Sequence, residues 1–300
     1  MYNAFFGFDQ NPFNMSPDPA FFFRSAQHEE VLANLIYGVQ SRKGFIVLTG
    51  EVGTGKTTML ECLRDFLAGQ QISFASLFNS RLTVEQFFEL FAHDLNLRCN
   101  RQSKTEVLLS LNQLLIERAT SGRTTVLIVD EAHNLDWDVL EEVRLLGNLE
   151  NRRGKLLQII LAGQQELDDK LERPEYRQLK QRISLRCTLR GFDLHDAIAY
   201  VNSRMARAGV PHQTFISSKV IEELHFRCQG IPRLINAVCD NLLLTCFALE
   251  TRTATLEMLN EVAADMRLEY PGRLSDLSDS SYSSRRQRIS STNVPSTNPR

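Results

Sequence analysis

The feature that most constrains the fold of this chain is a glycine-rich segment at residues 50–58, which reads GEVGTGKTT. It matches the pattern G-x-x-x-x-G-K-[ST] in full. An apolar run at 45–49 precedes the segment, and an amphipathic pattern follows it at 56–68. When a buried strand leads through such a loop into a helix, backbone N–H groups and the positive helix end face a bound phosphate. The segment therefore predicts a phosphate-binding loop in an α/β fold.

The residue types in this loop predict how it would hold a nucleotide. Lys56 would reach the β- and γ-phosphates, and the hydroxyl of Thr57 would ligate Mg²⁺. The expected ligands are therefore ATP and Mg²⁺. The predicted nucleotide-binding residues of the loop are Gly50, Glu51, Val52, Gly53, Thr54, Gly55, Lys56, Thr57 and Thr58.

A second apolar run, at residues 125–130, ends in the acidic pair Asp130-Glu131. Asp130 would lie at the carboxyl end of a strand, where an acidic group can bind nucleotide and hold the hydration shell of Mg²⁺. Glu131 is the predicted general base, because a carboxylate there can orient and deprotonate a water in line with the γ-phosphate. The pair therefore indicates nucleotide hydrolysis. Residues 130–133 also spell the box of one helicase class, but a helicase needs a second α/β domain.

From residue 44 onward, short apolar runs alternate with amphipathic patterns, which is typical of βαβ units that build a parallel sheet. Five strands are expected at 45–49, 72–78, 125–130, 156–162 and 184–189. The helices between them are expected at 56–68, 83–95, 105–119, 137–149 and 166–181. Beyond Gly191 the patterns are helical only, at 193–208, 217–229, 232–249 and 255–268. The predicted fold is an α/β core with a five-stranded parallel sheet, followed by a small all-helical lid.

These patterns divide the 300 residues into four parts. Residues 1–43 form an N-terminal strap and a first helix, 44–191 the α/β domain, 192–270 the helical lid, and 271–300 a tail rich in Ser and Arg. The tail is expected to be disordered, because it has too few apolar side chains to offset the entropy of ordering.

Composition and charge narrow the class of protein. Hydrophobic residues make up 43% and charged residues 23%, and the formal net charge is −2, so the chain has no global basic field that would indicate nucleic acid. The six cysteines lack metal-ligand spacing and are expected to be reduced. No apolar run reaches the ~18 residues of a membrane span. We expect a cytoplasmic protein without an integral membrane segment, which would contact the inner membrane only through a partner.

The first residues carry an unusual concentration of aromatic side chains. The sequence there includes Met1-Tyr2, Phe6-Gly7-Phe8, Pro12-Phe13, Pro17-Asp18-Pro19 and Phe22-Phe23. With the phosphate loop, the acidic pair and the helical lid, these residues resemble AAA+ ATPases of the ExeA/GspA-like family, which is associated with secretion and pili and related to TnsC-type transposition ATPases. The similarity covers about residues 1–268.

The resemblance implies roles for three further positions. Gln164 falls at the sensor-1 position and would respond to the γ-phosphate and the attacking water, although relatives usually have Pro where Gln165 stands. Arg182 falls at the position of the arginine finger that reaches a neighbouring subunit's nucleotide, with Arg177 as the second candidate. Gly230-Ile231-Pro232-Arg233 matches the sensor-2 pattern, in which Arg233 would bridge the γ-phosphate and close the lid.

The aromatic N-terminus has two compatible interpretations. In the first, Phe5, Phe6, Phe8 and Phe21–Phe23 are core residues that clamp the strap against the sheet domain. In the second, which the resemblance implies, the strap also forms a wall for the adenine, with Pro12 and Phe13 as the candidate residues.

The resemblance further implies a function. The chain would hydrolyse ATP and use nucleotide-dependent assembly with its own copies to remodel or position a protein client in secretion, pilus or polysaccharide-export machinery. The alternative is an ATP-dependent DNA-binding adaptor of the transposition type. In that case affinity for DNA would appear only with ATP and would fall steeply with salt.

Overall fold

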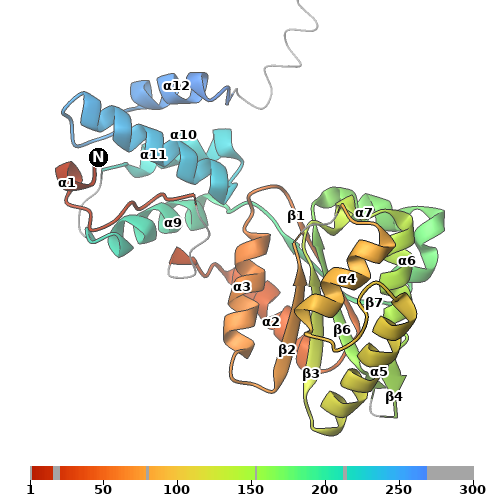
Figure 1. Cartoon of the computed structure of the whole chain (residues 1–300). Coiled ribbons are helices and arrows are strands. Elements are labelled where there is room, and N and C mark those ends of the chain that lie inside the picture. Colours follow the sequence, from red (N-terminus) through yellow and green to blue (C-terminus); the bar gives the residue numbers. More distant parts are fainter. Residues whose placement is uncertain (1, 16–20, 79–80, 153, 212–214, 269–300) are drawn as a thin grey trace, which may run out of the picture.

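The computed structural model describes residues 2–15, 21–78, 81–152, 154–211 and 215–268. Figure 1 shows these residues as an α/β part built around a sheet and a group of helices beside it. The tail, for which the sequence predicts disorder, lies outside the described residues.

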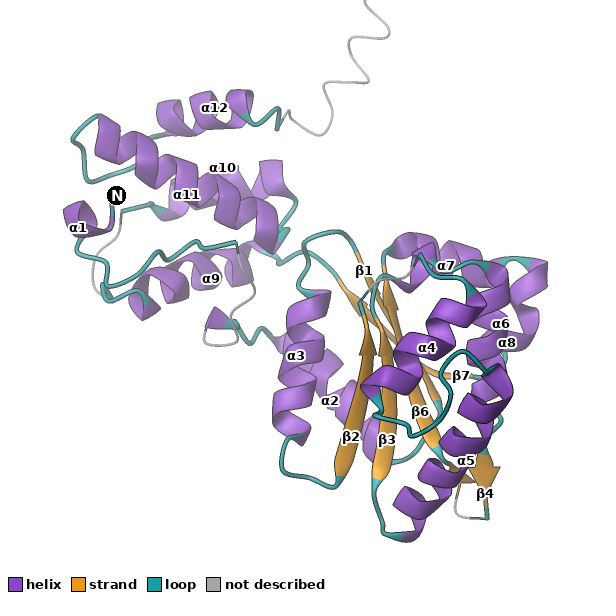
Figure 2. Ribbon diagram, viewed as in Figure 1, coloured by secondary structure: helices purple, strands orange, loops and turns teal. Residues whose placement is uncertain are grey.

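Five parallel strands form the central sheet, in the order β2-β3-β6-β1-β7 (Figure 2). The strands are β1 (Phe45–Gly50), β2 (Ile72–Leu77), β3 (Thr124–Val129), β6 (Leu157–Gly163) and β7 (Ile183–Leu189). In register, Thr49 of the inner strand β1 pairs with Gly163 of β6 on one side and Thr188 of β7 on the other. The fold class expected from the sequence is confirmed.

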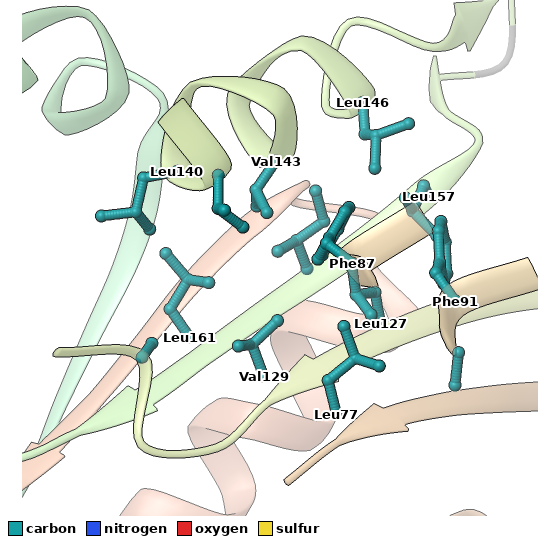
Figure 3. Packing of buried hydrophobic residues seen from close by; sticks show 14 of the residues in the cluster. Leu77, Phe87, Phe91, Leu127, Val129, Leu140, Val143, Leu146, Leu157 and Leu161 are labelled. Atoms are coloured by element: carbon teal, nitrogen blue, oxygen red, sulfur yellow. The ribbon is translucent and has the colours of Figure 1, made fainter. Parts of the chain in front are cut away.

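Helices cover both faces of the sheet. One face packs against α2 (Ala26–Gln40) and α3 (Lys56–Leu67). The other packs against α4 (Val84–Asp94), α5 (Lys104–Thr120), α6 (Trp137–Leu146) and α7 (Gln165–Glu172). Figure 3 shows this second interface, where Phe87 and Val143 meet Leu127 and Leu161 of the sheet. Because strand side chains alternate between two buried faces, the strands read as continuous apolar runs.

The segment 166–181, expected as one helix, is broken in the structure. Helix α7 ends at Glu172, a 3₁₀ helix follows at Pro174–Tyr176, and α8 spans Arg177–Lys180. Proline has no N–H to donate and its ring excludes the preceding helical turn, so Pro174 starts a new element. The apolar spacing across this break imitates a continuous helix.

Four short elements were not expected from the sequence. They are α1 (Asn3–Phe6), the 3₁₀ helix Ala132–Asn134, and the antiparallel pair β4 (Glu150–Asn151) and β5 (Gly154–Lys155). Each has at most four residues, which is too short for a period of 3.6 or 2 to be recognised.

Four helices follow the sheet, as expected, and we call them the lid. They are α9 (Leu194–Arg207), α10 (Ser218–Cys228), α11 (Pro232–Ala248) and α12 (Leu256–Asp265). Side chains of Asp193, Ser217 and Thr255 accept backbone N–H groups and start α9, α10 and α12. Within the described residues, no helix has the length and apolar character that a membrane crossing requires.

The strap, residues 2–15, packs against the lid and not against the sheet. Tyr2, Phe6, Phe8 and Phe13 belong to the same buried cluster as the apolar side chains of α9–α12. The ring of Phe6 meets that of Phe215 edge to face, with centroids 4.8 Å apart. The expected clamp on the sheet domain is therefore wrong for Phe6 and Phe8, whereas Phe22 does pack against the buried cluster of the sheet face. Helices already cover both sheet faces, so the lid offers the apolar surface on which the strap is buried.

Truncating a strap aromatic should destabilise the fold. Phe13 is fully buried, so Phe13→Ala should lower the free energy of unfolding by about 3–5 kcal/mol. Phe66→Ala is the control, because Phe66 is 54% exposed and its truncation should change stability by about 0.5 kcal/mol or less. Urea denaturation followed by circular dichroism measures both values. Equal losses would show that the strap is not part of the core.

Candidate active site

The glycine-rich loop between β1 and α3 makes a tight turn at the carboxyl edge of the sheet. Gly53 and Gly55 have φ angles of +84° and +97°, a left-handed region that favours glycine. The hydroxyl of Thr54 donates to the carbonyl of Glu51 at 2.9 Å and braces the turn from inside. The loop passes directly into α3 at Lys56, so its backbone curves around the N-terminus of that helix.

Lys56 is a buried cation at the centre of this loop. Its side chain is 6% exposed, and Nζ donates to the carbonyls of Gly50 and Glu51, each at 2.9 Å. Burial lowers the pKa of Lys56, and the nearby carboxylates of Glu131 and Asp130 partly oppose that shift. The ammonium group is thus held between the loop backbone and two acidic side chains.

Thr57 and Asp130 lie together, as the sequence predicts. The hydroxyl of Thr57 donates to Oδ2 of Asp130 at 2.9 Å, and the N–H of Glu131 donates to Oδ1 at 2.9 Å. Asp130 is 4% exposed, so its carboxylate is fixed on both oxygens. A hydroxyl and a carboxylate at this distance are the hard oxygen donors that Mg²⁺ prefers.

Glu131 occupies a strained backbone position beside the acidic strand end. Its φ angle is +53°, which costs a residue with a Cβ about 1–2 kcal/mol. Its side chain is 41% exposed, and Oε2 accepts from Nε2 of Gln164 at 3.4 Å. The fold therefore brings together the predicted base and the predicted sensor, which are separated by 33 residues along the chain.

His133 contacts the same turn but does not donate a hydrogen bond to Glu131, the predicted base. The backbone N–H of Gln164 donates to Nδ1 of His133 at 3.3 Å, which requires a lone pair on that nitrogen. In this arrangement Nδ1 accepts a hydrogen bond and does not donate to Oε2 of Glu131, which lies 3.4 Å away. The carboxylate of Glu131 stays free to accept a proton from elsewhere.

The lid touches the phosphate loop directly. Helix α11 begins at Pro232, and the backbone N–H of Arg233 donates to the carbonyl of Gly53 at 3.2 Å. A Cβ added to Gly53 would lie 2.6 Å from Cβ of Arg233. The start of this helix, where the sequence places sensor 2, therefore rests on the loop that would hold the phosphates.

A cavity of about 350 Å³ lies between the loop and the lid, within the size range of small-molecule sites. The phosphate loop, Glu131 and Arg233 line it together with a group of aromatic rings. Phe192 is central in that group, with ring centroids 4.9 Å from Tyr200, 5.3 Å from His28 and 5.5 Å from Phe23. The cavity thus joins an anion-binding loop to an aromatic wall.

Pro12 and Phe13, the residues expected to form a wall for adenine, are not among the described residues that line this cavity. Phe13 is fully buried inside the lid cluster, and the carbonyl of Pro12 accepts a hydrogen bond from Nε of Arg204. Other residues of the N-terminal segment line the cavity instead. They are Asn14, Met15, Phe21, Phe22 and Phe23.

Several wall residues were given no role at the site from the sequence. His28, Phe192, Tyr200, Arg204 and Asn236 line the cavity but lie in ordinary helical or loop patterns. Burial lowers the pKa of His28, which favours its uncharged ring beside Phe192. No local motif marks these positions, because only packing of the lid on the strap brings them together.

Arg182 lies at the amino ends of the strands, opposite the end that carries the phosphate loop. It precedes Ile183, which pairs with Phe45 at the start of β1, whereas the phosphate loop follows Gly50 at the end. Five residues of strand span about 17 Å, which is longer than an arginine side chain. Arg182 lowers the pKa of Glu141, although Arg144 is the larger cause. Neither Arg182 nor the exposed Arg177 lines the cavity within the described part of the chain.

A parallel sheet with a phosphate loop, an acidic strand end and a helical lid defines the AAA+ class of P-loop proteins. Residues 39–171 match the family model described as AAA domain. The chain is also 41% identical over 249 residues to General secretion pathway protein A of Aeromonas hydrophila. That match covers 83% of this chain but only 45% of the relative, so the chain spans less than half of the relative's length. The resemblance stated from the sequence is confirmed.

Solved structures show the same fold. Cdc6p from Pyrobaculum aerophilum has a TM-score of 0.64 and 18% identity, covering 83% of this chain and 71% of its own. The ORC2 protein of Aeropyrum pernix, solved as ADPNP-ADP complexes, has a TM-score of 0.58 and 13% identity, covering 85% of this chain and 71% of its own. At these identities the comparisons establish the architecture alone.

Gly53 should tolerate a side chain less well than a matched glycine elsewhere. Gly53→Ala and Gly69→Ala both place a Cβ at a left-handed φ, but only the first meets another group within 4 Å. We expect a loss of about 1 kcal/mol for Gly69→Ala and a further loss of about 1–3 kcal/mol for Gly53→Ala from displacing Arg233. Chemical denaturation checks this difference, and equal losses would contradict the contact between loop and lid.

Proposed function

We propose that this chain binds ATP with Mg²⁺ and hydrolyses it. The observation that carries the proposal is the convergence of Lys56, Thr57, Asp130, Glu131 and Gln164 at the carboxyl edge of the sheet, beside the cavity. Membership of the AAA+ class, to which many nucleotide-dependent enzymes belong, supports it. A site that only held nucleotide would not need a carboxylate placed as Glu131 is.

The residues present fit both ligands. The loop from Gly50 to Thr58 would surround the phosphates with N–H groups, and Lys56 would add a positive charge. Thr57 and Asp130 would hold Mg²⁺, directly or through water. When bound, Mg²⁺ offsets negative charge on the phosphate oxygens. The aromatic wall around Phe192 would stack against the base.

The side chains of this chain have distinct tasks in hydrolysis. Glu131 would orient a water and accept its proton, because its carboxylate is partly exposed and its histidine neighbour has no proton to give at Nδ1. Gln164 would hold Glu131 through its amide and donate toward the attacked group. Lys56 and Arg233 would stabilise charge that develops on the phosphate oxygens.

We further propose that the active form contains several copies. Arg182 is too far from its own phosphate loop to serve it, so it would act as a finger on the site of an adjacent copy, with Arg177 as the second candidate. Assembly would accompany ATP binding, because Arg233 links the lid to the loop.

The cellular role proposed here follows the relative's printed name. The assembled protein would remodel or position a protein partner in a secretion or pilus-type machinery. It would work in the cytoplasm and reach the inner membrane through that partner. Since the chain spans 45% of the relative, this role is an inference from the shared region.

Replacing the base should separate binding from hydrolysis. Glu131→Gln keeps a similar shape but cannot accept the proton, so ATP turnover should fall about 10²- to 10⁴-fold while ATP affinity is retained. Lys56→Ala should lose ATP binding itself. Glu166→Gln is the matched control, because Glu166 is an exposed carboxylate near Lys56 that does not line the cavity. Phosphate release and calorimetry measure both properties, and parental turnover in Glu131→Gln would refute the assignment.

The finger assignment predicts complementation between variants. Arg182→Ala should be nearly inactive alone, because its sites receive no finger. Mixing it with Glu131→Gln, which keeps its finger but has no base, should restore part of the turnover. Arg177→Ala, mixed in the same way, tests the second candidate. Parental turnover by Arg182→Ala, or turnover by a strictly monomeric protein, would contradict the finger.

A further inference from the structure

Arg204 is a buried cation without an acidic partner among the described residues. It is 7% exposed, and none of the ion pairs among the described residues includes it. Its Nε donates to the carbonyl of Pro12, its Nη2 to that of Asn14 at 3.2 Å, and its Nη1 to the hydroxyl of Tyr200 at 3.3 Å. The guanidinium also lies over the ring of Phe21, 4.6 Å from its centroid. Arg204 therefore joins the strap, α9 and the cavity wall.

The contact with Tyr200 fixes the direction of the next hydrogen bond. Arginine can only donate, so the oxygen of Tyr200 accepts from Arg204 and its own proton must point elsewhere. That proton is donated to Oδ1 of Asn236 at 2.8 Å. Burial raises the pKa of Tyr200, so the hydroxyl keeps this proton. Since Oδ1 of Asn236 accepts the proton of Tyr200, the Nδ2 group is the part of the Asn236 amide that remains able to bind another group.

That free end faces the cavity. Asn236 is 8% exposed and lines the cavity, and no described residue accepts a hydrogen bond from its Nδ2. Among the described residues, Thr251 Oγ1 is the one side-chain polar atom that is sealed from solvent without a partner. The Nδ2 group is therefore open to the space that Asn236 lines. Asn236 also lies one helical turn after Arg233 and touches the aromatic wall through Tyr200.

We propose that Nδ2 of Asn236 recognises an acceptor nitrogen of adenine, and that Arg204, through Tyr200, is the positioning residue that keeps this donor directed into the cavity. This inference rests on the proposed binding of ATP. Adenine offers ring nitrogens that accept hydrogen bonds. Guanine shares the acceptors N3 and N7 with adenine but carries an N–H at N1, where adenine has an acceptor. A hydrogen bond from Asn236 to N1 would therefore favour ATP over GTP, whereas one to N3 or N7 would not.

Ring-modified nucleotides test the contact atom by atom. Affinities of ATP, 1-deaza-ATP, 3-deaza-ATP, 7-deaza-ATP and GTP are measured by calorimetry for the parent protein and its variants. One deaza analogue should bind the parent about five- to tenfold more weakly than ATP, the value of one hydrogen bond. Asn236→Ala should bind ATP weaker by the same factor and no longer distinguish ATP from that analogue.

Two variants separate recognition from structural support. Asn236→Asp keeps an acceptor for Tyr200 but replaces the donor in the cavity, so it should lose the discrimination while its thermal unfolding stays near the parental value. Tyr200→Phe breaks the link to Arg204 and should reduce the discrimination in part. Asn241→Ala is the matched control, because Asn241 is exposed on the same helix and bonds to Ala237. It should retain the full discrimination of the parent.

The outcomes distinguish this inference from the proposed function. If the parent binds ATP and Asn236→Ala keeps the same preference among the analogues, the inference is wrong and the proposed function stands. If the parent discriminates against none of the deaza analogues, the inference is also wrong. If the parent binds no nucleotide, both are wrong. Loss of discrimination in Asn236→Ala and Asn236→Asp, with retention in Asn241→Ala, supports the inference.

Discussion

The parallel direction of all five strands is the constraint on which the site depends. Because every strand ends at the same edge, the loop after β1, the acidic pair after β3 and Gln164 after β6 meet there. The same arrangement places Arg182, which precedes β7, at the far edge. Because all strands run in the same direction, Lys56, Asp130 and Glu131 lie together, and the candidate finger Arg182 lies far from the phosphate loop of its own chain.

The lid and the strap form a second unit over that edge. Their side chains share one buried cluster, and Arg204 ties the backbone of the strap to α9. The N-terminal segment leads to α2, which packs on the sheet, while residues 190–193 link the sheet to α9. The cavity lies where these connections meet. Its aromatic wall therefore depends on the strap as well as on the lid helices.

Much of this organisation was predictable because local signals carried it. The strands and the four lid helices agree with the sequence patterns to within a few residues, since burial imposes periods of 2 and 3.6 on the chain. The loop and the acidic pair are contiguous motifs. The prediction of one helix at 166–181 was wrong, because Pro174 interrupts the helix although the helical spacing of apolar residues continues past it. The strap was predicted to pack on the sheet domain and packs on the lid instead, because an apolar residue in a sequence predicts burial but not the surface against which it is buried.

Sequence motifs were enough to predict an AAA+ type fold with a phosphate loop and to select Lys56, Thr57, Asp130 and Glu131 as candidate site residues, because these residues lie in short motifs beside recognisable strands. Tertiary structure alone decided that Phe13 is buried in the lid, away from the cavity, and that Asn236 opens into the cavity. Phe13 and Asn236 take these positions through contacts between segments about 190 to 240 residues apart, such as those of Arg204 with Pro12 and of Tyr2 with Asp240. Periodicity within one segment contains no information about such contacts.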